Sequence, residues 1–180
     1  MEYIFLAGVH GVGKSTLGAR IKDKLSVKCM SVSDLIRKSG NNLKQEDKYT
    51  AGISHNQELW KEELKKLSIE ESILLLDGHF CLLNEEGEVT SLPFSTFNNT
   101  KMKSIILMKH KPEVLRERLL SRDKVDYSLE LIRELQETEV ERAYNYSKIK
   151  NVKMFIYDEV EPFNDLINFI KKQGCNYNGT

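Results

Sequence analysis

The most constraining feature of the chain is a glycine-rich segment near its start, Gly8-Val-His-Gly-Val-Gly-Lys-Ser15, which fits the pattern G-x-x-x-x-G-K-[ST] at every fixed position. It directly follows the apolar run Tyr3–Ala7, which is typical of a strand buried on both faces of a parallel sheet. It directly precedes Thr16–Leu25, where apolar residues recur at helical spacing. A strand, a glycine loop and a helix in this order predict a loop that wraps a phosphate group at the helix N-terminus.

Each part of this loop has a task in the predicted phosphate site. The glycines let backbone N–H groups turn toward one anion, and the helix N-terminus adds its dipole. Lys14 is expected to reach the β- and γ-phosphates of a nucleotide, and the Ser15 hydroxyl to take a Mg²⁺ position. His10, inside the loop, either senses a ligand or faces solvent. The expected nucleotide-binding residues are Gly8, His10, Gly11, Val12, Gly13, Lys14, Ser15 and Thr16.

The order of apolar runs along the rest of the chain predicts the fold. Four further runs have the buried-strand pattern, and segments with helical spacing separate them. This alternation favours an α/β fold, a three-layer α/β/α arrangement with a five-stranded parallel sheet and a ligand crevice at the carboxyl ends of the strands. We expect one domain over residues 1–173, a polar tail over 174–180, and irregular segments at 39–50 and 84–99. The four runs are Cys29–Val32, Ile73–Leu76, Ser104–Met108 and Val152–Tyr157.

Composition disfavours several classes of partner. Among 180 residues, 27 Lys and Arg balance 27 Asp and Glu, so the chain offers no overall field to hold a nucleic acid or an acidic membrane surface. No apolar stretch approaches the roughly 18 residues that a membrane helix requires, and the first residues lack the basic region of a signal peptide. Cys29, Cys81 and Cys175 are too widely spaced for a disulfide framework or a zinc site. We therefore expect a cytoplasmic protein.

A carboxylate follows the third apolar run, in the sequence Leu76-Asp-Gly-His-Phe80. Asp77 would stand at the carboxyl end of its strand, which is the form of a Walker B carboxylate, and would hold Mg²⁺ together with Ser15. The alternative is an aspartate that only caps a turn. His79 either orders a water or contacts the transferred group, or it packs beside the loop without a chemical role.

The segment just past the second apolar run, Ser31-Val-Ser-Asp-Leu-Ile-Arg37, resembles a conserved segment of nucleoside monophosphate kinases, with Ser33 in place of a glycine. In that family the arginine holds the phosphate of the acceptor nucleotide, which a guanidinium suits because its fork is bidentate. The resemblance implies that Arg37 binds the acceptor phosphate, with Ser33 and Asp34 beside it. The alternative is a helix N-cap at Ser33 or Asp34, with Arg37 solvated.

A helix is predicted from Pro112, since proline is favoured at the first helical position. Arg118 and Arg122 are four residues apart and share one face of it, while Arg116 lies roughly opposite. The pair resembles the arginines that open the lid of nucleoside monophosphate kinases, where they lie by the ATP base and the transferring phosphoryl group. The resemblance implies catalytic roles for both, nucleotide binding by Arg118, and a short lid over about residues 122–128. Alternatively, both are solvated and pair with glutamates of the same helix.

The long helix expected from about Ser128 has two polar side chains on an otherwise apolar stripe. These are Gln136 and Glu139, which share the face of Ile132. Comparison with the same family implies a catalytic, lid-closing arginine on this helix, and Arg142 is the better match.

Taken together, the resemblance extends from Tyr3 to about Ile170 and is strongest for the compact archaeal and nuclear type of adenylate kinase. It implies a Mg²⁺-dependent phosphotransferase that moves the γ-phosphoryl group of ATP to a small acceptor, with a nucleoside monophosphate such as AMP as the first candidate. The acceptor-binding insert would occupy about residues 39–70. Trp60, inside this insert, is expected to belong to the core rather than to stack on a base.

Two other functions fit the same motifs. One is a kinase for a different small acceptor, such as a sugar acid, a vitamin precursor or a polynucleotide 5′ end, although net neutrality disfavours the last. The other is a nucleotide-binding switch or ATPase that acts on a protein partner through the segment 84–99.

Overall fold

The computed structural model describes residues 1–39, 53–67, 73–158 and 160–174, and of residues 53–57 and 174 the backbone alone. Much of the predicted acceptor insert, nearly all of the predicted irregular segment 39–50 and most of the predicted tail lie outside the described residues.

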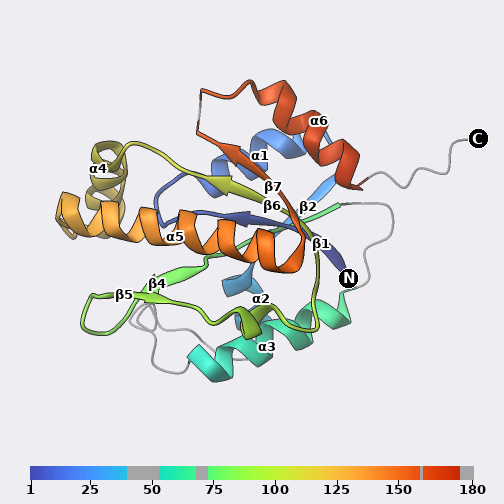
Figure 1. Ribbon diagram of the computed structural model, residues 1–180, viewed down its shortest axis with the longest axis horizontal. Coiled ribbons are helices and arrows are strands. Elements are labelled where there is room, and N and C mark those ends of the chain that lie inside the picture. The colour runs from blue at the N-terminus through green and yellow to red at the C-terminus, as the bar shows by residue number, and fades with distance from the viewer. Residues whose placement is uncertain (40–52, 68–72, 159, 175–180) are drawn as a thin grey trace, which may run out of the picture.

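Five parallel strands form the central sheet in the order β2-β3-β1-β6-β7 (Figure 1). Strand β1 lies at the centre and pairs with β3 on one side and β6 on the other. Each strand overlaps one of the five apolar runs, so the predicted α/β fold with a five-stranded parallel sheet is confirmed. The strands are β1 (Glu2–Ala7), β2 (Val27–Ser31), β3 (Ile73–Asp77), β6 (Lys101–Met108) and β7 (Lys153–Tyr157).

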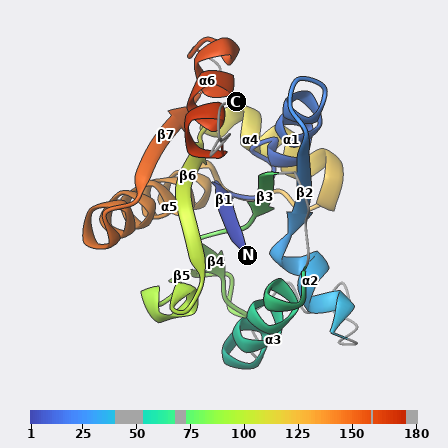
Figure 2. The ribbon, with the colours of Figure 1, turned by 90° about the vertical axis from the view of Figure 1, so that its right-hand side faces the viewer.

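Helices cover both faces of the sheet. Helices α1, α4 and α6 pack on one face and α2 and α3 on the other (Figure 2), while α5 contributes Ile132 and Leu135 to the first core layer and Ala143 and Tyr146 to the second. Helix α4 begins at the predicted proline, and the Ser128 side chain caps α5 by accepting the N–H of Leu131 at 3.1 Å. Their bounds are α1 (Lys14–Lys22), α2 (Val32–Lys38), α3 (Ile53–Lys66), α4 (Pro112–Asp123), α5 (Leu129–Lys150) and α6 (Phe163–Gly174).

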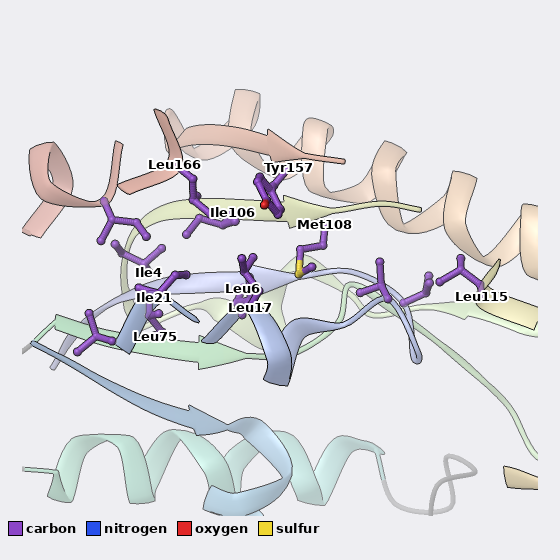
Figure 3. Packing of buried hydrophobic residues seen from close by; sticks show 14 of the residues in the cluster. Ile4, Leu6, Leu17, Ile21, Leu75, Ile106, Met108, Leu115, Tyr157 and Leu166 are labelled. Carbon is purple, nitrogen blue, oxygen red and sulfur yellow. The ribbon is translucent and has the colours of Figure 1, made fainter. Parts of the chain in front are cut away.

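Alternation along the strands divides the core into two layers. Ile4 and Leu6 of β1 face the layer that α1 and α6 cover, where Leu17 and Leu166 pack (Figure 3). The alternate residues of β1, which are Tyr3, Phe5 and Ala7, face the opposite layer, and both sets are buried. A strand that is buried on both faces has no polar side, which is why it appears in the sequence as a continuous apolar run.

The prediction of an irregular segment at 84–99 is wrong in part. Strands β4 (Cys81–Leu83) and β5 (Val89–Ser91) pair as an antiparallel hairpin, and the 3-10 helix η2 (Phe94–Phe97) follows. The Asn84 side chain accepts the N–H of Glu88 at 2.7 Å, and Gly87 has φ +80°. Strands of three residues are too short to display an alternating pattern, so they escape a search by periodicity.

Aromatic side chains support the segment that follows β3. The Phe80 ring lies 5.2 Å from that of Phe5 and 5.0 Å from that of Phe97, measured between ring centroids. Trp60 is fully buried in the same layer, as expected for a core residue. A Cβ at Gly78 would lie 2.6 Å from the Phe5 ring, so close packing requires glycine there.

Candidate functional site

The predicted phosphate loop connects β1 to α1 at the carboxyl end of the sheet. Gly8, Gly11 and Gly13 have φ values of 141°, 80° and 105°, which L side chains rarely adopt. Helix α1 begins after Gly13, which has no side chain to cap it, and its first turn holds no acidic residue. The N–H groups and the dipole of this helix end therefore favour an anion inside the loop.

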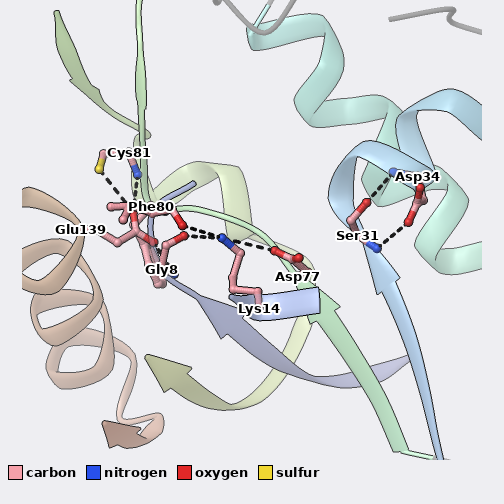
Figure 4. A network of polar contacts seen from close by, with 9 residues as sticks. Gly8, Lys14, Ser31, Asp34, Asp77, Phe80, Cys81 and Glu139 are labelled. Carbon is pink, nitrogen blue, oxygen red and sulfur yellow. Dashed lines mark hydrogen bonds and ion pairs between the residues drawn. The ribbon is translucent and has the colours of Figure 1, made fainter. Parts of the chain in front are cut away.

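Lys14 lies buried at the base of the loop (Figure 4). Its Nζ donates to the carbonyl oxygens of Gly8 and Val9, at 2.5 and 3.2 Å, and lies 3.5 Å from Oδ1 of Asp77. Burial lowers the pKa of Lys14, while the carboxylates of Asp77 and Glu139 act in the opposite direction. The loop thus holds the Lys14 amino group at its floor, next to an acid from the neighbouring strand.

The two predicted metal ligands, Asp77 and Ser15, lie at the end of β3 and in the first turn of α1. Asp77 ends β3 beside Leu6 of β1, and burial raises the pKa of its carboxyl, an effect that Lys14 opposes. Ser15 is exposed in the first turn of α1. Within the described ranges, no cluster of three or more His, Cys, Asp or Glu side chains could hold a metal ion by itself. One hydroxyl and one carboxylate next to a phosphate loop nevertheless fit Mg²⁺, which keeps most of its water and shares phosphate oxygens.

A buried carboxylate that sequence reasoning did not assign lies behind the loop. Oε1 of Glu139 accepts the N–H of Gly8 at 3.0 Å, and Oε2 accepts those of Phe80 and Cys81 at 2.8 and 2.9 Å (Figure 4). The Cys81 thiol lies 3.3 Å from Oε2. The signal in the sequence was a polar residue on an apolar helical stripe, but its partners could not be identified because they lie 58 to 131 residues away.

His79 packs against the phosphate loop. Its ring centroid lies 4.1 Å from that of His10, and its Nδ1 is buried without a hydrogen-bond partner in the structure. Burial holds the pKa of His79 well below its usual value, and the nearby Lys14 and His10 act in the same direction. The imidazole is therefore neutral at physiological pH.

The two arginines of α4 that were predicted to bind nucleotide or act in catalysis, Arg118 and Arg122, make different contacts. Arg118 donates from Nη1 to the carbonyl oxygen of Val12 at 3.2 Å, and its Nη2 lies 3.3 Å from Nε2 of His110. Arg122 makes a bidentate ion pair with Asp123, at 2.7 and 2.6 Å. Arg118 thus lies on the phosphate loop, and neither of these contacts involves a glutamate of the same helix.

A pocket of about 300 Å³ lies between the loop, α4, α5 and the hairpin. Most of the side chains around it are apolar, and its polar lining comes from the phosphate loop and the end of α4. The lining residues are His10, Leu83, Leu119, Arg122, Asp123, Val125, Tyr127, Leu131, Ile132 and Leu135.

The predicted acceptor segment forms the start of α2. Ser31 caps this helix, because its Oγ accepts the N–H of Asp34 at 2.9 Å while Asp34 accepts the N–H of Ser31 at 3.0 Å. The alternative cap at Ser33 or Asp34 is therefore wrong, since Asp34 is the third residue of the helix. Arg37 is exposed and pairs with Asp34, and Ser33 is exposed beside them.

Arg142 lies against the segment between β5 and η2. It donates to the carbonyl oxygen of Leu92 at 2.6 Å, and its guanidinium lies 3.9 Å from the centroid of the Phe94 ring. These contacts fix the segment to α5. The lid-closing role implied by the family resemblance stays a prediction.

The chain is similar to one described protein family and to a solved structure. A family described as "AAA domain" matches residues 7–136, which is more than half of the chain. Among solved structures, a gluconokinase from Sinorhizobium meliloti 1021 is similar, with a TM-score of 0.48 and 18% identity over 93% of this chain and 87% of that one. No curated protein matches the sequence. Among the described residues, no helix is long and apolar enough to span a membrane.

Proposed function

The chain belongs to the AAA domain family, and from this membership we propose that it is a Mg²⁺-dependent phosphotransferase that moves the γ-phosphoryl group of ATP to a small acceptor. The observation that carries the proposal is the convergence of Lys14, Asp77 and Arg118 on one glycine loop. Phosphoryl transfer requires positioning and charge neutralisation rather than a covalent nucleophile. These three side chains and the loop N–H groups supply both.

The residues around the loop divide this work. The N–H groups of the loop and of the first turn of α1 donate to phosphate oxygens, and Lys14 places its charge against the β- and γ-phosphates. Ser15 and Asp77 would hold Mg²⁺, which when bound neutralises charge on the phosphate oxygens.

Arg122 and His79 are proposed to act at the transferred group. The Arg122 side chain is exposed, although that of its partner Asp123 is largely covered, so the guanidinium can reach a phosphoryl oxygen from the solvent side of the ion pair. A neutral His79 can accept one hydrogen bond and donate another, which suits it to orient an acceptor or a water beside His10. The loop over residues 122–128 is proposed to be the lid, within a single domain over residues 1–173.

AMP is the acceptor that we propose first, with Arg37 as the ligand of its phosphate. The exposure of both side chains in the Arg37–Asp34 ion pair supports this role, because the guanidinium can turn to a new anion without losing a buried contact. The neighbouring Ser33 hydroxyl is also open to solvent.

The pocket next to His10 favours a second candidate, a kinase whose acceptor has an apolar body. The pocket is at the lower end of the size range of small-molecule sites, and it offers few hydrogen-bonding groups for a nucleobase. Arg122 at its edge would then face the group that receives the phosphoryl.

The deciding experiment measures ADP formation from Mg·ATP by the wild type and by Lys14→Ala. The acceptor panel holds nucleoside monophosphates, sugar acids and small alcohols with apolar bodies, together with a control without acceptor. Lys22→Ala is the matched control, since Lys22 is an exposed lysine at the end of the same helix. We expect ADP in proportion to one acceptor, and a loss of about 10² or more in kcat for Lys14→Ala alone.

Two results would count against this function. Unchanged turnover in a folded Lys14→Ala protein would remove the phosphate loop from the reaction. Slow hydrolysis that no acceptor accelerates would favour an ATPase or switch that acts on a protein partner through the segment 84–99.

A further inference from the structure

Helix α5 places two polar side chains, three residues apart, behind the phosphate site. The first is Glu139, whose carboxylate joins the start of the phosphate loop at Gly8 to the segment after β3 at Phe80 and Cys81. These three backbone groups and the carboxylate are all buried. One side chain thus ties together the ends of two neighbouring strands, directly beneath Lys14.

The second is Gln136, which holds the end of a third strand. Its Oε1 accepts the N–H of His110 at 2.8 Å, and its Nε2 donates to the carbonyl oxygen of the same residue at 2.8 Å. The His110 ring in turn lies 3.3 Å from Arg118, which contacts the carbonyl oxygen of Val12 in the phosphate loop. Glu139 therefore contacts the phosphate loop directly, and Gln136 is linked to it through His110 and Arg118.

We propose that Gln136 and Glu139 are positioning residues, which hold the loops after β1, β3 and β6 in the arrangement that binds nucleotide. The inference rests on the nucleotide-binding part of the proposed function and is independent of the acceptor. It also gives α5 a role beyond packing. This helix follows the proposed lid directly in the chain.

The chemistry of each position is specific. A carboxylate has only acceptors, and the groups around Glu139 are all donors. A glutamine there would turn its NH₂ either toward the N–H of Gly8 or toward those of Phe80 and Cys81. The reverse holds at Gln136, which must donate and accept at once, because a glutamate would bring an oxygen against the carbonyl oxygen of His110.

The opposite hydrogen-bonding requirements at Glu139 and Gln136 define the test. Glu139→Gln replaces a carboxylate with a carboxamide, Gln136→Glu makes the reverse change, and both keep the size of the side chain. The matched control is Glu137→Gln, which makes the same chemical change at an exposed position of the same helix. Titration calorimetry with Mg·ADP gives both the dissociation constant and the fraction of protein that binds, and a thermal melt reports the stability of each variant.

We expect both exchanges to raise the dissociation constant roughly tenfold or more, with the binding fraction unchanged and the control like the wild type. A purely structural role would lower the melting temperature and the binding fraction but leave the dissociation constant of the folded protein unchanged, and that result would overturn the inference. If Glu139→Gln does not fold, the dissociation constant of Mg·ADP for Gln136→Glu decides, since Gln136 is only half-buried.

The wild-type titration separates the two proposals. Wild-type protein that does not bind Mg·ADP would remove the proposed nucleotide site and this inference with it. Wild-type binding that both exchanges leave equally tight would overturn the inference alone and leave the proposed function standing.

Discussion

Replacing His79 with asparagine should flatten the dependence of the free energy of unfolding on pH between 7.5 and 5.5. Nδ1 of His79 is buried without a hydrogen-bond partner in the structure, and Lys14, His10 and Arg122 all disfavour a further positive charge there. The folded protein therefore keeps this imidazole neutral, whereas the unfolded chain protonates it near pH 6.5. Because the unfolded state binds more protons, the wild type is destabilised as the pH falls below 6.5 and is unaffected above it.

The size of the effect follows from this difference in protonation. For a histidine that is held neutral in the folded state and has a pKa of about 6.5 in the unfolded state, the cost is negligible at pH 7.5 and approaches about 1 kcal/mol at pH 5.5. Asparagine does not titrate, so the variant should lose less stability than the wild type over this range, by on the order of 1 kcal/mol.

Urea unfolding of both proteins at pH 7.5, 6.5 and 5.5 measures this difference, because all other titrating groups are common to the two chains. His10→Asn is the control that keeps His79 in place. It should retain most of the wild-type dependence, since burial is the largest cause of the lowered pKa. Equal losses of stability in the wild type and in His79→Asn would show that this imidazole is not the group held neutral.

Three further outcomes are expected. Gly78→Ala should destabilise the fold by about 1–3 kcal/mol, because its Cβ would lie 2.6 Å from the Phe5 ring. Gly18→Ala should stabilise α1 by up to about 1 kcal/mol, because the nearest side-chain atom would lie 3.4 Å from its Cβ. Urea unfolding that ranks the two variants in reverse order would contradict this packing. Arg37→Ala should raise the KM of the acceptor more than that of ATP in steady-state assays, and an equal or opposite effect would remove this residue from the acceptor site. Arg122→Ala should lower kcat with little change in ATP binding, while a loss of ATP affinity alone would place the residue beside the base.

The edge strands β2 and β7 are partly exposed, and the sheet could be predicted from the sequence mainly because the central strands β1, β3 and β6 are buried on both faces along most of their length. Such strands read as continuous apolar runs, and the glycine motif fixed the position of the first loop between a strand and a helix. The hairpin of β4 and β5 could not be predicted, since strands of three residues carry too little pattern. The residue that caps α2 was also misplaced, because Ser31 and Ser33 offer the same chemistry and only the path of the backbone distinguishes them.

The site was predictable where its residues lie within one motif. The phosphate loop with Lys14 is such a case, and so is Asp77, which the end of an apolar run marks out. Glu139 and Gln136 were visible as polar residues on an apolar stripe, but their partners come from other parts of the chain. Spacing along one helix gives no information about contacts across 131 residues.

The contact between Gly8 and Glu139 also sets an order of events during synthesis. The glycine loop leaves the ribosome well before the carboxylate that accepts the Gly8 N–H, because the two residues are 131 positions apart in the chain. Contacts of such long range form late, after the cost of closing the intervening chain has been met. A nascent chain therefore carries its most recognisable motif long before that motif has its anchor, and a product truncated ahead of α5 would have the signature without the buried acceptor behind it.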